Sequence, residues 1–93
     1  MAEKITTLHP EKAKQGVNID KHKYDLIRNA ILAEIDARGE ISFTELLSAV
    51  ERRLPGFKGS INWYTTTIKL DLEARHLIER VPGKTPQYLQ RPR

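Results

Sequence analysis

The sequence predicts a small, mainly α-helical domain with three helices and an antiparallel β hairpin after them. Three observations support this fold class. Apolar residues recur at helical spacing in three successive segments, glycine or proline–glycine ends the first two, and a turn-rich stretch separates two short apolar runs near the C-terminus. The chain has 93 residues, which suits one domain built on one core.

The first helix is expected from about Lys21 to Arg38. Asp20 is a favourable N-cap residue, and Gly39 is favourable just beyond the last turn. Between them, apolar residues recur at intervals of three and four positions, which predicts one face packed on the core. This stripe consists of Tyr24, Ile27, Ile31 and Ile35.

The second helix has the clearest start signal. Ser42 and Glu45 have the spacing of a capping box, and Pro55–Gly56 ends the helix. Residues 40–41, which separate the first helix from this cap, allow only a very short strand. The inner face of the second helix is expected to comprise Phe43, Leu46, Leu47, Val50 and Leu54.

The third helix is expected over residues 60–75, with Ser60 as its N-cap. Two short strands, 77–81 and 87–90, follow it, and the turn cluster 82–86 between them is typical of a β hairpin. The third helix turns Ile61, Tyr64, Ile68 and Leu72 inward. The predicted core includes Ile27, Ile31, Ile35, Leu46, Leu47, Val50, Ile68, Leu72, Leu77 and Ile78.

This order of elements resembles a winged helix-turn-helix domain, in which a three-helix core carries a β-hairpin wing. Residues 41–50 resemble the first helix of the helix-turn-helix pair, and residues 70–83 resemble the end of the recognition helix leading into the wing. His76 stands where such families commonly have a glycine in left-handed backbone. The whole chain is also similar to a small uncharacterised bacterial family with a winged-helix core. Residues 1–19 contain few apolar side chains and are expected to form an N-terminal arm, and residues 20–93 are expected to form the winged-helix domain.

Composition argues against several classes of protein. The chain has no cysteine, which excludes a disulfide framework, a cysteine nucleophile and a thiolate zinc site. Its histidines, His9, His22 and His76, do not have metal-ligand spacing, and no glycine-rich phosphate loop occurs. We therefore expect no enzymatic activity, no metal and no cofactor. No apolar run has the length of a membrane span and the first residues do not resemble a signal peptide, so we expect a cytoplasmic protein.

Charge and fold resemblance together favour DNA binding. The formal net charge is +4, and both ends of the chain are basic. In a helix-turn-helix protein the second helix of the pair enters the major groove, so we expect double-stranded DNA to contact helix 60–75 and the wing near 82–86. The function expected is that of a transcriptional regulator. The expected DNA-binding residues are Lys58, Ser60, Asn62, Trp63, Thr66, Thr67, Lys69, Arg80 and Lys84.

The outer face of helix 60–75 also supports an alternative. It carries no arginine, and its apolar residues Trp63 and Leu70 suit a protein interface better than a polar groove. The alternative function is a protein–protein interaction or dimerisation module of winged-helix fold that binds no DNA. A third interpretation is that Trp63 packs on Phe57, which would leave this face less apolar. The sequence leaves the DNA target, any effector and the oligomeric state open, a homodimer included.

Overall fold

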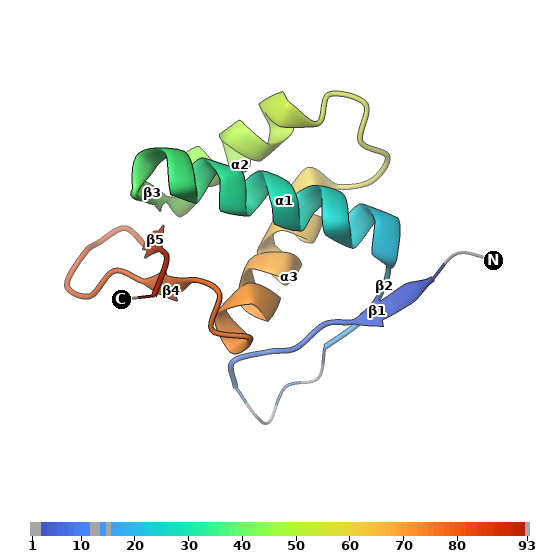
Figure 1. Ribbon diagram of the computed structural model, residues 1–93, viewed down its shortest axis with the longest axis horizontal. Coiled ribbons are helices and arrows are strands. Elements are labelled where there is room, and N and C mark those ends of the chain that lie inside the picture. The colour runs from blue at the N-terminus through green and yellow to red at the C-terminus, as the bar shows by residue number, and fades with distance from the viewer. Residues whose placement is uncertain (1–2, 12–13, 15, 93) are drawn as a thin grey trace.

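Three helices and two small antiparallel sheets build the fold in a computed structural model (Figure 1). The structure describes residues 3–11, 14 and 16–92. The elements are β1 (Lys4–Thr6), β2 (Asn18–Asp20), α1 (Lys21–Arg38), β3 (Glu40–Ser42), α2 (Phe43–Arg53), α3 (Ile61–Ala74), β4 (Glu79–Arg80) and β5 (Tyr88–Gln90). About half of the chain is helical, which confirms the predicted fold of helices with a small antiparallel sheet.

The helices begin and end at the residues that the sequence marks. Gly39 follows α1 with φ 81°, and its N–H donates to the Ile35 carbonyl at 2.7 Å. At the start of α2, Ser42 Oγ accepts a hydrogen bond from the Glu45 N–H at 3.2 Å. Ser60 Oγ accepts from the Trp63 N–H at 3.1 Å, which fixes the first turn of α3. Asp20 precedes α1 but makes no side-chain capping bond.

The apolar stripes of the three helices meet in one core. All predicted core residues are buried except Leu47 and Leu77, which are half-buried. Leu47 lies at the edge of the inner face of α2 and lines a shallow surface depression beside Ile61, so its inclusion in the core was wrong. The buried cluster comprises Ile19, Tyr24, Ile27, Ala30, Ile31, Ile35, Ile41, Leu46, Val50, Ile68, Leu72, Ile78 and Leu89.

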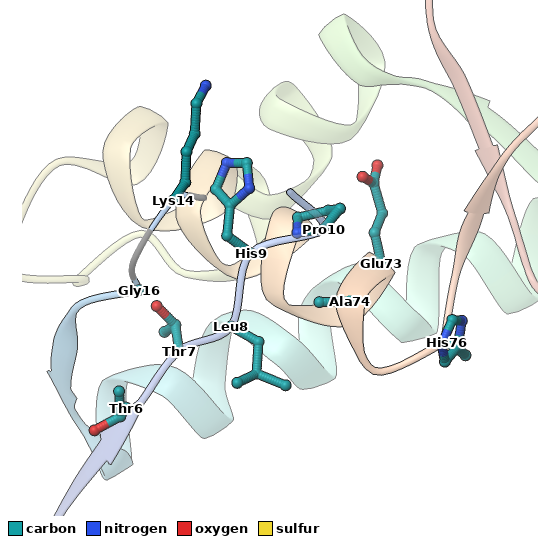
Figure 2. A pocket seen from close by; sticks show the side chains of 10 residues that line it. All are labelled: Thr6, Thr7, Leu8, His9, Pro10, Lys14, Gly16, Glu73, Ala74 and His76. Atoms are coloured by element: carbon teal, nitrogen blue, oxygen red, sulfur yellow. The ribbon is translucent and has the colours of Figure 1, made fainter. Parts of the chain in front are cut away.

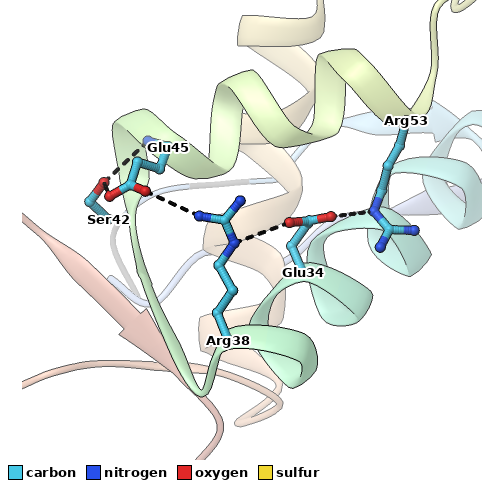
Figure 3. A network of polar contacts seen from close by, with 5 residues as sticks. All are labelled: Glu34, Arg38, Ser42, Glu45 and Arg53. Carbon is cyan, nitrogen blue, oxygen red and sulfur yellow. Dashed lines mark hydrogen bonds and ion pairs between the residues drawn. The ribbon is translucent and has the colours of Figure 1, made fainter.

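Ion pairs join α1 to α2 at the surface (Figure 3). Glu34 on α1 accepts from Arg53 Nε at 2.5 Å and lies 3.4 Å from Arg38 Nε. Arg38 also donates to Glu45 Oε2 at 3.1 Å. The hydrogen bond from Arg53 holds the pKa of the Glu34 carboxyl below its ordinary value. These contacts fix the first helix of the predicted helix-turn-helix pair on α1.

The C-terminal hairpin joins the core through a three-stranded sheet in the order β3–β5–β4. Leu89 on β5 pairs with Ile41 on one side and with Arg80 on the other. The strand β4 is shorter than the predicted strand 77–81, because Leu77 still takes part in the C-terminal capping of α3. Its N–H donates to the Leu72 carbonyl at 2.9 Å, and His76 has φ 62°, the expected left-handed conformation.

The N-terminal arm forms its own two-stranded sheet. β1 and β2 pair antiparallel, with Ile5 opposite Ile19. Ile19 is buried in the common core and Ile5 packs against it. Residues 7–10, which follow β1, pass beside the C-terminal half of α3 (Figure 1). The arm therefore contributes to the same surface as the outer face of α3.

Candidate interaction surface

The outer face of α3 presents mostly uncharged side chains. Asn62 and Trp63 are exposed, as predicted, whereas Thr66, Thr67 and Leu70 are half-buried. Trp63 is the most open of the large apolar side chains described, with 47 % of its surface exposed. This face carries the residue types of a protein interface, an aromatic side chain among small polar and aliphatic ones.

Lys69 does not belong to this outer face, and its expected contact with DNA phosphate was wrong. Only 4 % of its surface is exposed. Its Nζ donates to Gln87 Oε1 at 2.6 Å and lies 3.1 Å from Glu73 Oε1. Burial lowers the pKa of Lys69, while the neighbouring carboxylate of Glu73 acts in the opposite direction. Lys69 lies at the margin of the buried stripe, and its hydrogen bond to Gln87 joins α3 to the segment before β5.

The wing cations expected to contact DNA lie beside carboxylates. Arg80 Nε is 3.8 Å from Glu73 Oε1. Lys84 forms an ion pair with Glu40, and its Nζ lies 4.6 Å from the centroid of the Tyr88 ring. Part of the positive charge that a phosphate would use is thus already neutralised within the chain.

The remaining predicted contacts lie at the other end of α3. Lys58 and Ser60 are exposed in the connection that precedes the helix, and Asn62 is exposed in its first turn. Arg80, in contrast, lies near Glu73 in the last turn. A helix of 14 residues spans about 21 Å, so the structure does not bring these cations into one cluster.

Trp63 rests on Tyr64 rather than on Phe57. The Trp63 and Tyr64 rings meet edge to face with 4.9 Å between centroids, and Tyr64 meets Phe57 in the same way at 5.1 Å. Gly59 permits this packing, because a Cβ there would lie 2.8 Å from Tyr64 Cε2. The indole is therefore supported on one side and open on the other.

A groove of about 150 Å³ runs between the arm and α3. Among the described residues, the large apolar side chains that are exposed are Leu8 at 45 %, Val17 at 39 % and Trp63 at 47 %, and all three line this groove. We call it the α3–arm face and define it by Leu8, Val17, Trp63, Thr67 and Leu70. Thr7, His9 and Gly16 complete the described lining, and none of these described residues is Lys, Arg, Asp or Glu.

The groove continues into a wider cleft of about 750 Å³ beneath the arm (Figure 2). One wall is formed by residues 6–10, 14 and 16 of the arm, and the other by Glu73 and Ala74 at the end of α3 and by His76 just beyond it. In Figure 2 the side chains of His9 and His76 lie on different walls and do not point toward one another. Within the described residues, no group of three His, Asp or Glu side chains is placed to hold a metal ion.

A buried carboxylate holds the arm on α3. Asp71 is fully buried, and its carboxylate accepts hydrogen bonds from the Leu8 N–H at 2.8 Å, from Arg75 Nε at 2.9 Å and from the Tyr24 hydroxyl. Burial, and then the bond to Asp71, raise the pKa of Tyr24 to about 12. Leu8 is thus fixed at its backbone, while its side chain is exposed.

A close contact across the arm holds Val17 in place. The Val17 N–H donates to Thr7 Oγ1 at 2.9 Å, and the Thr7 N–H donates to the Val17 carbonyl at the same distance. Gly16 packs so tightly that an added Cβ would lie 1.6 Å from the Thr7 carbonyl oxygen. Leu8 and Val17 are therefore presented by an ordered scaffold. Sequence reasoning did not place these two residues beside Trp63, because the contact depends on pairing across the arm and on Asp71.

The fold and this surface define a small helical domain with an exposed apolar face, and a sequence comparison places it in a family. The chain belongs to the family of unknown function DUF6958, whose sequence profile matches residues 4–89. The match therefore includes most of the arm and most of the hairpin. No curated protein matches the chain. None of the helices in the described ranges is long and apolar enough to cross a membrane.

Proposed function

We propose that the chain is a winged-helix protein-interaction module that binds its partner through the α3–arm face. The winged-helix assignment is supported by the order of the elements, since α2 and α3 follow one another and the β4–β5 hairpin pairs with β3. The function rests chiefly on one observation, the meeting of Leu8, Val17 and Trp63 at one groove. Contiguous exposed apolar surface marks interaction sites in soluble proteins.

The chemistry of the face fits a protein partner. Interface cores are poor in charged residues and rich in aromatic anchors, and the part of this lining that the structure describes contains Trp63 and no Lys, Arg, Asp or Glu. The edge-to-face contact with Tyr64 holds the indole in place before any partner arrives. A side chain that is already ordered loses less entropy on binding, which favours its use as an anchor.

DNA binding is the second candidate, and the exposed N-terminal end of α3 favours it. Lys58, Ser60 and Asn62 are all exposed there, where a recognition helix contacts phosphates and bases. Nucleic-acid affinity depends on neutralised phosphates, however, and three of the four predicted cations are buried or beside a carboxylate. We therefore rank a protein partner above DNA.

Photocrosslinking in the native host tests this proposal. A benzoylphenylalanine replaces Val17 in the α3–arm face, and a matched variant carries it at Ser48, an exposed position on α2. We expect a discrete crosslinked protein product from position 17 that is absent from position 48. Equal patterns from the two positions, together with tight binding of mixed-sequence duplex DNA at low salt, would contradict the proposal and favour the DNA-binding candidate.

A further inference from the structure

We infer that the partner of the α3–arm face is a second copy of this chain, bound about a twofold axis. The inference rests on the proposed function, because it names the occupant of the same surface. In a twofold dimer a surface patch meets an identical patch, so the patch must complement itself in shape and in charge.

The charge of the face is compatible with a second copy and does not suit a strongly charged partner. The chain has a net charge of +4, so two copies repel one another unless they meet where little charge lies. Among the described residues, no Lys, Arg, Asp or Glu lines the groove of the α3–arm face. The adjoining cleft adds one residue of each sign, Lys14 and Glu73. A surface for nucleic acid or for a strongly charged protein would instead carry a clear excess of the opposite sign.

The shape of the face offers both a ridge and a groove. Trp63 stands on one wall with about half of its surface open, and Leu8 and Val17 stand on the other wall, on the arm. In a twofold arrangement, the indole of each copy can cover the groove of the other, so that the apolar ridges of both copies are buried in the dimer. Reciprocal insertion of this kind places an aromatic anchor of each copy in the desolvated centre of the interface.

The face is already formed in one copy of the chain. The arm is tied to α3 by the bond between Leu8 N and Asp71 Oδ1 and to itself by the contacts of Thr7 with Val17. Association therefore requires no folding step and no exchange of segments, and the dimer should form at the rate of ordinary rigid-body docking.

Sedimentation of the full chain from low micromolar to near-millimolar concentration tests this inference. The Leu8→Glu variant places a charge at the centre of the face, where a twofold axis brings it near its own copy. Ser48→Glu is the matched control, since it adds the same charge to an exposed position on α2. We expect a reversible monomer–dimer equilibrium that Leu8→Glu weakens by at least about tenfold and Ser48→Glu leaves within about twofold. Leu8→Asn, which is polar and uncharged, should give an intermediate loss.

A helical circular dichroism spectrum like that of the wild-type chain shows that each variant is folded. A wild-type chain that stays monomeric throughout overturns the second-copy inference, and so does a dimer that Leu8→Glu and Ser48→Glu weaken equally. The crosslink from position 17 distinguishes this result from failure of the proposed function. A product with the mass of two chains supports the second copy, whereas a product of another mass overturns it and retains the interaction module.

Discussion

The carboxylate of Asp71 holds the backbone of Leu8 against α3, with 2.8 Å between Leu8 N and Asp71 Oδ1. The two residues are far apart in the sequence, and their bond determines which side of α3 the arm covers. The same carboxylate accepts from Tyr24 on α1 and from Arg75 at the end of α3. One buried group thus links the arm, α1 and α3, and it places an exposed leucine beside the exposed tryptophan.

Loss of this carboxylate should destabilise the fold and release the arm. Asp71→Ala leaves the Tyr24 hydroxyl, Arg75 Nε and the Leu8 N–H without their acceptor, and breaking a buried charged network costs about 3–5 kcal/mol. Asp36→Asn is the control, because the pair between Asp36 and Arg91 is exposed and such pairs contribute about 0–1 kcal/mol. Urea unfolding measures both variants, and equal losses would show that Asp71 has no special role.

Amide hydrogen exchange separates arm release from general destabilisation. In the milder Asp71→Asn variant the carboxamide still accepts one bond, so the fold should persist while the hold on the arm weakens. We expect the Leu8 and Val17 amides to exchange faster and the Ile31 amide on α1 to remain protected. Uniform acceleration at all three amides would argue against a local release.

The stability of the protein should fall as pH rises above 10, through Tyr24. The folded state raises the pKa of Tyr24 from 10.0 to about 12, so it favours the neutral phenol. This contribution to stability is complete below pH 10 and is lost as pH rises from 10 to about 12, because the unfolded chain releases the proton first. Tyr24→Phe lacks this titration, so the gap in unfolding free energy between it and the wild-type chain should narrow over that range. A gap that is constant with pH would contradict the account.

Truncation of one isoleucine and of one leucine distinguishes the core from its margin. Ile68 has no exposed surface, and Ile68→Ala should cost about 2–5 kcal/mol of unfolding free energy. Leu47 is half-buried, so Leu47→Ala leaves a gap that water can enter, and it should cost about 1 kcal/mol, well below a core truncation. Denaturant melts give both values. Equal losses of unfolding free energy would show that Leu47 is a core residue.

The sequence was sufficient for the helices and most of the core, since both follow from local signals. The stripe around Ile31, the cap at Ser42 and the stop at His76 are each encoded within a few residues. The candidate surface was predicted less well. Lys69 has the helical phase of a margin residue, and only the distant Gln87 and the neighbouring Glu73 draw its amine inward. Such long-range polar contacts leave no periodic signal in a sequence.

We therefore expect the Lys69 side chain to stabilise the folded protein. Lys69→Ala removes a buried stem and leaves the Glu73 carboxylate without its nearest cation, so we expect a loss of about 2–4 kcal/mol. Lys58→Ala, at an exposed position in the connection before α3, should change stability by less than about 0.5 kcal/mol. Thermal unfolding of the two variants checks this. Wild-type stability in the Lys69→Ala variant would contradict the ion pair described here.

The emission of Trp63, the one tryptophan of the chain, tests the central claim most directly. Its exposed half lies in the α3–arm face, so burial by a protein partner shifts the emission to the blue, and contact with DNA quenches it. We predict a blue shift as the concentration of the chain rises, loss of that shift in Leu8→Glu, and no response to duplex DNA at low salt. Quenching by duplex DNA, with emission that does not depend on protein concentration, would contradict the account and assign the face to DNA.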